Sequence, residues 1–301
     1  MKIVFFGTPD FAVTSLSKIF ESHHKLEAVV TAPDKERGRG RKVSVTPVKE
    51  FALSKNIPFL QPEKLKEEKF IEQLKQIEAD LFVIVAFRIL PKEVFTLPKY
   101  GSINLHGSLL PKYRGAAPIQ WAIINGEKET GVTTFFLKEK VDTGNMILQE
   151  KIVIEPEDNY ESLHDKMKNV GAEVLVKTIS LIERGEVDEQ PQNDSLASPA
   201  PKITKEICKI DWTKSAVDIH NLIRGLSPYP GAFFIKDDKQ YKVYKSKVVE
   251  ETKLQPAEIL ESKNEIFIGC GEGTLQILEI QPEGRKRMTA DEFLRGYSLI
   301  K

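Results

Sequence analysis

The sequence places two polar side chains, Asn104 and His106, two positions apart at the end of a strand-like segment. Because side chains two positions apart on a strand share a face, the amide and the imidazole are predicted to lie side by side. Together they suit polarising a carbonyl oxygen and moving a proton. Asp142 lies before a Thr-Gly turn, and a carboxylate near a histidine can fix its tautomer or raise its pKa. The alternative interpretation is a packed histidine and a turn-forming aspartate.

Other familiar catalytic signatures do not occur in the sequence. The first strand-to-helix turn, at residues 7–9, lacks the further glycines of a dinucleotide-binding fingerprint. There is no phosphate-binding P-loop and no serine nucleophile elbow. Cys208 and Cys270 lie far apart without a C-x-x-C spacing, so we predict neither a disulfide framework nor a metal site and expect both thiols in the core.

Strand and helix patterns alternate in the first half of the chain, which carries these polar residues. Strand-like runs lie at residues 2–7, 26–32, 57–60, 81–87, 103–106, 131–137 and 146–154, and helical patterns at 46–55, 63–77 and 160–184. Strands joined through helices favour crossover units and a mostly parallel sheet. We therefore predict a Rossmann-like, doubly wound α/β domain over residues 1–189.

The composition changes near residue 185, where Glu, Gln, Asn, Ser and Pro replace most apolar residues. Such a stretch is typical of a linker, which we place at residues 190–206. Beyond it, a helical pattern at 215–226 precedes two strand pairs, 232–236 with 241–249 and 265–270 with 274–280. These pairs predict a small β-barrel domain over residues 207–301.

The 301 residues are 41% hydrophobic and 29% charged, a composition typical of globular proteins rather than disordered chains. The longest apolar run covers seven residues, 81–87, too few to span a bilayer. The first residues lack the apolar stretch of an export signal, so we expect a cytoplasmic protein without a membrane partner. The formal net charge is zero, so any attraction to nucleic acid must be local.

One local charge cluster stands out, the window at residues 34–49, with a net charge of +4. Within it, Gly38 and Gly40 separate three arginines, Arg37, Arg39 and Arg41, and Lys42 follows. A flexible basic arm of this kind can follow a phosphate backbone. The alternative interpretation is a solvated surface loop.

Taken together, these segments resemble the methionyl-tRNA formyltransferase family over nearly the whole chain. The most specific match is the segment at 101–121, which holds Asn-Leu-His and Ser-Leu-Leu-Pro and is similar to the formyltetrahydrofolate enzyme signature. Val-Asp-Thr-Gly at 141–144 is similar to a second signature. Further similar segments lie at residues 3–12, 34–49, 200–203, 210–212 and 221–232.

The resemblance implies that 10-formyltetrahydrofolate donates a formyl group to the amine of methionine on initiator methionyl-tRNA, without a metal. It implies Asn104, His106 and Asp142 as the catalytic residues. Their chemistry agrees: the amide and a protonated imidazole can donate hydrogen bonds to the developing oxyanion, while the carboxylate stabilises the charged ring.

The resemblance also implies the binding residues, and we expect a monomeric protein. The reduced folate would contact Ser108, Leu109, Leu110 and Pro111, with Phe87, Ile89 and Leu90 at the pterin side. The tRNA would contact Arg37, Arg39, Arg41 and Lys42. An OB-like C-terminal domain would also bind the tRNA.

The sequence departs from the family pattern in three places. Residues 86–91 are one residue shorter than the usual Tyr-Gly-containing stretch, residues 138–140 are more basic than usual, and residues 205–301 carry 16 basic and 15 acidic side chains.

Three other functions are alternatives to this interpretation. A sugar-amine formyltransferase shares the catalytic chemistry, but the basic arm favours tRNA. A glycinamide ribonucleotide formyltransferase usually ends near residue 190. A non-catalytic RNA-binding protein would leave the three polar residues without a role.

Overall fold

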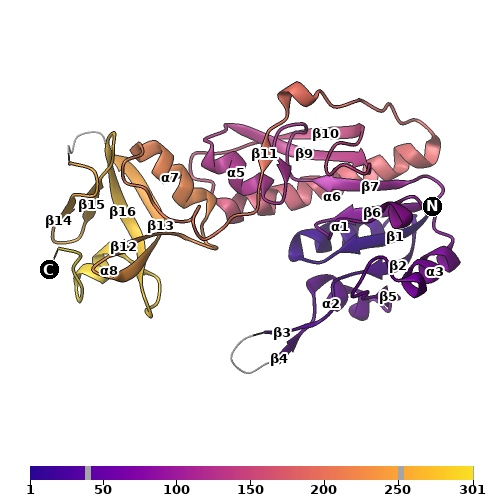
Figure 1. Cartoon of the computed structure of the whole chain (residues 1–301), viewed down its shortest axis with the longest axis horizontal. Helices are drawn as coiled ribbons and strands as arrows, with labels where there is room; N and C mark the ends of the chain where they lie inside the picture. Colours follow the sequence, from indigo (N-terminus) through magenta and orange to yellow (C-terminus); the bar gives the residue numbers. More distant parts are fainter. Residues whose placement is uncertain (38–41, 250–253, 301) are drawn as a thin grey trace. The chain divides into compact units, whose positions relative to one another are not determined.

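The computed structural model describes residues 1–37, 42–249 and 254–300 (Figure 1). These residues form two compact units. The first comprises residues 1–115, 130–152 and 164–199, and the second comprises residues 116–129, 153–163 and 200–301.

The first unit contains a seven-stranded sheet in the order β10-β9-β7-β6-β1-β2-β5 (Figure 1). The strands are β1 (Lys2–Gly7), β2 (Lys25–Val30), β5 (Phe59–Leu60), β6 (Leu81–Val85), β7 (Ser102–His106), β9 (Glu129–Phe136) and β10 (Met146–Val153). The five strands from β7 to β5 pair in parallel, and β9 pairs with β7 in the antiparallel direction. The predicted doubly wound, mostly parallel sheet is confirmed.

The apolar runs of the sequence lie at the centre of this sheet. Every residue of β6 is buried, as are residues 3–7 of β1. Strands covered on both faces need apolar side chains at each position, which is why these runs do not alternate with polar residues. The sheet therefore supplies a rigid base for the polar side chains at the end of β7.

Helices connect these strands and cover the sheet. They are α1 (Asp10–Phe20), α2 (Pro47–Ser54), α3 (Glu68–Ile77), α4 (Lys92–Phe95) and α6 (Tyr160–Arg184). Thr46 caps α2, since its hydroxyl accepts a hydrogen bond from the Lys49 amide. Along α6, Leu163, Met167 and Val174 are buried, and Leu163 and Met167 are fully inaccessible to solvent.

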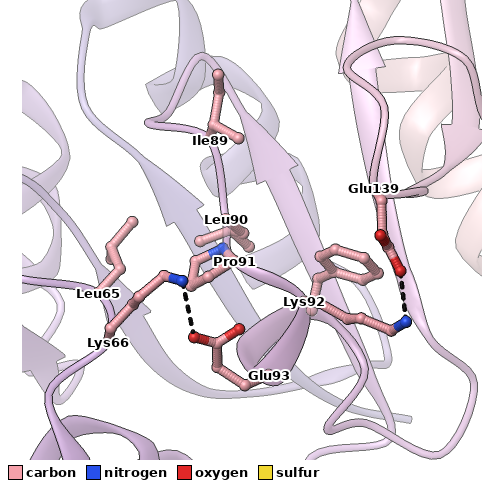
Figure 2. A pocket seen from close by; sticks show the side chains of 9 residues that line it. Leu65, Lys66, Ile89, Leu90, Pro91, Lys92, Glu93 and Glu139 are labelled. Atoms are coloured by element: carbon pink, nitrogen blue, oxygen red, sulfur yellow. Dashed lines mark hydrogen bonds and ion pairs between the residues drawn. The ribbon is translucent and has the colours of Figure 1, made fainter.

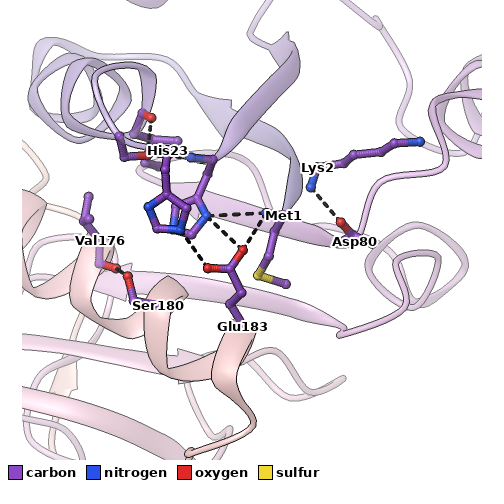
Figure 3. A network of polar contacts seen from close by, with 10 residues as sticks. Met1, Lys2, His23, Asp80, Val176, Ser180 and Glu183 are labelled. Atoms are coloured by element: carbon purple, nitrogen blue, oxygen red, sulfur yellow. Dashed lines mark hydrogen bonds and ion pairs between the residues drawn. The ribbon is translucent and has the colours of Figure 1, made fainter.

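A polar network joins the start of β1 to the end of α6 (Figure 3). One carboxylate oxygen of Glu183 accepts a hydrogen bond from the amino group of Met1 at 2.8 Å, and the other lies 2.7 Å from His23 Nε2. These two contacts, the first above all, lower the pKa of Glu183 to about 2. The neighbouring His24 is buried, and burial lowers its pKa. The charged carboxylate of Glu183 is therefore paired with the amino group that precedes β1.

The second unit is built on an antiparallel sheet in the order β12-β13-β16-β15-β14, with β17 beside β16. The strands are β12 (Ala232–Lys236), β13 (Lys239–Val249), β14 (Ile259–Glu261), β15 (Ile266–Gly269), β16 (Thr274–Pro282) and β17 (Met288–Thr289). Both strand pairs predicted from the sequence occur. This half-barrel sheet confirms the predicted small β domain, and Cys208 and Cys270 are buried in its core as expected.

The second unit also includes residues that the sequence-based division places in the first domain. Helix α5 (Pro118–Ile124) packs on α7 (Ala216–Gly225), and α8 (Ala290–Leu294) lies near the end of the chain. The packing of α5 on α7 is close, because a Cβ on Gly225 would lie 2.7 Å from Ile124 Cγ1. Residues 116–129 and 153–163 thus group with the C-terminal residues through contacts that sequence order does not reveal.

The predicted linker at 190–206 is also held by specific contacts. It contains a 3₁₀ turn, η1 (Asp194–Leu196), and the short strand β11 (Pro199–Ala200). Gln190 exchanges two backbone hydrogen bonds with Met146 of β10. The polar composition of this stretch therefore reflects its exposure on the surface and not a lack of contacts with the rest of the fold.

No helix within the described ranges is both long and apolar enough to cross a membrane.

Candidate active site

Asn104 and His106 lie on β7, between β6 and the antiparallel β9, in regular register. The regular pairing puts both side chains on one face, as predicted. The intervening Leu105 is 3% exposed, whereas Asn104 is only half-buried. Its side-chain amide has no hydrogen-bond partner among the residues that the structure describes. The amide is therefore available to donate to a bound carbonyl oxygen.

The imidazole of His106 is buried and held by a backbone group. Its Nε2 lies 2.8 Å from the carbonyl oxygen of Tyr113. Because a carbonyl oxygen only accepts hydrogen bonds, Nε2 carries a proton and Nδ1 is the nitrogen that can exchange one. Tyr113, rather than the predicted Asp142, therefore fixes the tautomer of His106.

Asp142 faces the other ring nitrogen of His106. Its Oδ2 lies 3.8 Å from Nδ1, beyond direct hydrogen-bond distance but within ion-pair distance of a protonated ring. The same oxygen accepts a hydrogen bond of 2.9 Å from the Gly115 amide. The structure thus brings together the predicted imidazole and carboxylate from two distant segments.

The turn around Asp142, between β9 and β10, has a constrained backbone conformation. Asp142 has φ +53°, in the left-handed region that residues with side chains seldom adopt. Gly144 admits no side chain, because a Cβ there would lie 1.5 Å from the carbonyl oxygen of Phe136. The sequence Asp-Thr-Gly therefore has a structural reason as well as a chemical one.

The predicted folate segment at Ser108–Pro111 is tightly engaged within the protein. Ser108 is fully buried, and its hydroxyl donates to the carbonyl of Lys112. The Leu110 amide donates to Thr133 Oγ1, and its carbonyl accepts from Gln149. The backbone N–H and C=O of Leu110 are thus both engaged within the protein rather than free for a ligand. Leu109 and Pro111, both half-buried, are its accessible members.

The other predicted folate residues follow β6 and differ in exposure. Phe87 packs edge-on against Phe6, with ring centroids 5.6 Å apart. Leu90 is 5% exposed, whereas Ile89 is 72% exposed. The cation of Arg88 lies over the Phe87 ring and donates to two backbone carbonyls, which fixes the segment. Ile89 is thus the member best placed for contact with a ligand.

An open pocket of about 440 Å³ lies beside this segment (Figure 2). Its lining is partly apolar and partly charged and comprises Leu65, Lys66, Ile89, Leu90, Pro91, Lys92, Glu93, Phe95 and Glu139. Lys66 pairs with Glu93 at 3.3 Å, and Lys92 pairs with Glu139. The hydrogen bond from Lys92 to Glu139 raises the pKa of Lys92. Sequence reasoning identified Ile89 and Leu90 here but missed the two ion pairs.

The basic arm is flanked by a short antiparallel hairpin, β3 (Lys35–Arg37) and β4 (Lys42–Ser44). Arg37 and Lys42 lie opposite each other in its register. Arg39 and Arg41 lie outside the described residues. At the base, Lys49 donates a hydrogen bond to Asp34, which lowers the pKa of that carboxyl group. This pair neutralises one charge of each sign in the basic window.

One cluster of metal-ligating residue types occurs among the described residues, and it contains none of the predicted site residues. His23, His24 and Glu183 have ligand atoms within 4.8 Å of one another. Both oxygens of Glu183 already contact cationic or donor groups, the Met1 amino group and the His23 ring. The cluster had no sequence signal, because Glu183 lies far along the chain from the two histidines.

Comparisons with known proteins identify the family to which the chain belongs. The family model described as formyl transferase matches residues 1–179, and the model of the formyl transferase C-terminal domain matches residues 202–298. A methionyl-tRNA formyltransferase from Caldanaerobacter subterraneus subsp. tengcongensis is 51% identical over 302 residues, covering 99% of this chain and 98% of that protein.

Two solved structures are similar in fold. The sugar 3N-formyl transferase WlaRD has a TM-score of 0.70 at 24% identity, covering 95% of this chain and 99% of that one. HypX from Aquifex aeolicus, in complex with tetrahydrofolic acid, has a TM-score of 0.68 at 19% identity. The match covers 99% of this chain but about half, 48%, of HypX. At these identities, both likenesses establish the fold alone.

The match to a C-terminal domain model disfavours a glycinamide ribonucleotide formyltransferase that ends near residue 190. The chain is 51% identical to a methionyl-tRNA formyltransferase over nearly the full length of both proteins. Its likeness to the sugar enzyme WlaRD, at 24% identity, establishes a similar fold alone. Since both family models match, the chain belongs to the formyl transferase family, in its methionyl-tRNA formyltransferase branch.

Proposed function

We propose that this protein transfers the formyl group of 10-formyltetrahydrofolate to the amino group of methionine on initiator methionyl-tRNA. The observation that carries the proposal is the approach of His106 Nδ1 and Asp142 Oδ2 to 3.8 Å, on the same strand face as the available amide of Asn104. The name and length of the 51% identical relative support this choice of acceptor.

The reaction forms one bond and breaks one. The methionine amine attacks the formyl carbon, the bond from that carbon to N10 of the folate breaks, and a proton passes from the amine to N10. The Asn104 amide donates a hydrogen bond to the formyl oxygen, where negative charge develops. His106 exchanges a proton at Nδ1, because Tyr113 occupies Nε2. Asp142 stabilises the imidazolium across the gap.

Folate contact is assigned to the accessible members of the two predicted segments. Ile89, exposed in the lining of the open pocket, supplies an apolar surface for the flat pterin and its linker, and the half-buried Phe87 adds to it, whereas Leu90 is buried. In the second segment, the half-buried Leu109 and Pro111 are the assigned contacts, while the buried Ser108 and Leu110 hold the segment in place. The fit rests on apolar side chains and on the amide of Asn104, both of which the ligand's chemistry requires.

Contact with tRNA is assigned to the arm that carries Arg37, Arg39, Arg41 and Lys42. The β3–β4 hairpin places the backbones of Arg37 and Lys42 opposite each other, at the two ends of the basic arm. Guanidinium groups bind phosphates in a bidentate manner, which suits a tRNA acceptor end. We assign the protein a monomeric state and a cytoplasmic location, where charged initiator tRNA is formed.

The test compares two acceptors with one donor. Radiolabelled formyl transfer from 10-formyltetrahydrofolate is measured to charged initiator tRNA and, separately, to an amino-sugar nucleotide. We expect label on the tRNA alone. Transfer to the sugar nucleotide alone would replace the proposed acceptor with the one that the WlaRD fold accommodates.

A further inference from the structure

A glutamine from the stretch that the sequence predicts as a linker reaches the turn that carries Asp142. The side-chain nitrogen of Gln192 donates hydrogen bonds to the carbonyl oxygens of Asp142, at 2.9 Å, and Gly144, at 2.8 Å. The turn includes a residue with φ +53°, a conformation that persists only when its surroundings hold it. Gln192 therefore holds the turn by its backbone, while Gly115 holds the carboxylate.

Gln192 is itself held by Arg114. Its Oε1 accepts hydrogen bonds from Arg114 Nε at 3.0 Å and Nη2 at 2.6 Å. The same guanidinium pairs with Asp194 at 2.7 Å, and the Arg114 side chain is only 14% exposed. Gln192 thus uses both its donor and its acceptor atoms. A carboxylate at this position would keep the bonds from Arg114 but could not donate to the two carbonyls.

The same stretch of chain also holds the partner of His106. Ser198 Oγ accepts a hydrogen bond from the Tyr113 amide, and the Ser198 carbonyl accepts one from the Arg114 amide, both at 2.9 Å. Tyr113 in turn supplies the carbonyl that contacts His106 Nε2. Residues 192–198 therefore fix the supports of the imidazole and the carboxylate relative to each other.

We propose that Gln192 is a positioning residue for formyl transfer, which sets the place of Asp142 relative to His106. The inference rests on the proposed catalytic roles of these two residues. Gln192 acts through the Asp142 turn and has no assigned contact with either substrate. The gap of 3.8 Å between Nδ1 and Oδ2 depends on that turn, and a displacement of about 1 Å can cost up to roughly a hundredfold in rate.

The first test separates turnover from binding in two variants, Gln192→Ala and Gln192→Glu. We expect kcat to fall by at least about tenfold in both, with KM for the folate and for the tRNA within about twofold of the parent value. Gln190→Ala is the matched control, because Gln190 is exposed and its side-chain amide donates to Asp188. It should keep the parent kcat. An unchanged kcat in Gln192→Glu would overturn the proposal.

The second test asks whether Gln192 acts through Asp142. Gln192→Glu is combined with Asp142→Ala, and kcat is compared across the four proteins. We expect Gln192→Glu to lower kcat by less than about twofold once the Asp142 carboxylate is absent. Equal effects with and without Asp142 would show a general structural role and overturn the inference. An unchanged kcat in Asp142→Ala alone would instead overturn the catalytic assignment on which it rests.

Discussion

The active-site turn and the segment at 86–93 belong to the same unit, yet their side chains are held in different ways. At the turn, the Asp142 carboxylate accepts from Gly115, and His106 is fixed by Tyr113. In the other segment, Ile89 is 72% exposed. Two ion pairs nearby, Lys66 with Glu93 and Lys92 with Glu139, lie on the open surface. A group that moves a proton must be fixed, whereas a surface that admits a ligand must be open.

This contrast assigns different kinetic roles to the two regions. Substitutions at the turn should lower kcat, because they disturb groups that act in the transition state. Substitutions at the exposed segment should raise KM, because they remove contacts that the bound ground state shares with the transition state. The two kinds of substitution therefore test whether the division holds.

The largest effect is expected from His106→Ala or Asp142→Ala. Loss of the imidazole or its carboxylate partner should lower turnover by roughly a hundredfold or more, since each acts where charge and protons move. Single-turnover rates at saturating 10-formyltetrahydrofolate would measure it, with circular dichroism to confirm folding. A folded His106→Ala protein with nearly unchanged turnover would remove the imidazole from the mechanism.

The site could be predicted from sequence where side-chain chemistry and strand alternation decide it. Asn104 and His106 share a strand, so their common face follows from the period of two. Tyr113 and Gly115 could not be predicted as partners, because they act through backbone groups that any residue type possesses. Gln192 was hidden for a different reason. Its polar, proline-rich surroundings are typical of a linker, and only the folded chain shows its contacts.

The fold shows the same division between local and distant information. The predicted strands of the parallel sheet occur because a buried strand must be apolar at each position. The grouping of α5 with α7 was missed, since it depends on the close approach of Ile124 to Gly225 from a distant segment. The β3–β4 hairpin was also missed, because each strand has only three residues and a charged composition.

The basic arm offers the next largest effect, on tRNA binding alone. Replacing Arg39, Arg41 and Lys42 with alanine should weaken binding and flatten the slope of log K against log salt by roughly 0.7 to 0.9 for each phosphate that the arm no longer neutralises. Binding of the variant at several salt concentrations would measure the slope. The KM for the folate should not change.

A control of equal charge distinguishes local contact from general attraction. Lys64, Lys69 and Lys75 are exposed on or beside α3, and their joint replacement with alanine removes the same charge. Its salt slope should match that of the parent protein. Equal slopes for the arm variant and the parent would return the arm to a solvated loop without a role in tRNA binding.

A smaller effect is expected at Ile89. Ile89→Ala removes apolar surface that the folate would cover, which costs about 1 kcal/mol and raises the folate KM about fivefold. The value of kcat should stay within about twofold of the parent value. Leu53→Ala is the control, because Leu53 is also exposed, at 53%, but lies on α2. A loss of kcat at Ile89 without a change in KM would break the proposed contrast between the two regions.

The smallest effect concerns stability rather than catalysis, at a site outside both regions. The hydrogen bond from the Met1 amino group lowers the pKa of Glu183 to about 2, below the unfolded value of 4.5. A carboxyl group with a lowered pKa stabilises the folded state above its unfolded pKa, and the contribution is lost as pH falls from about 4.5 towards 2. Glu183→Gln should therefore lower the urea midpoint at pH 7 and leave it nearly unchanged at about pH 2. Glu173→Gln, at an exposed position of the same helix, should shift neither midpoint.

The same variant also tests how far the fixed region reaches. Because the Glu183 network lies apart from the proposed catalytic groups, the kcat of Glu183→Gln at pH 7 should equal that of the parent. A lowered kcat would mean that the fixed region extends from the Asp142 turn to the far end of α6.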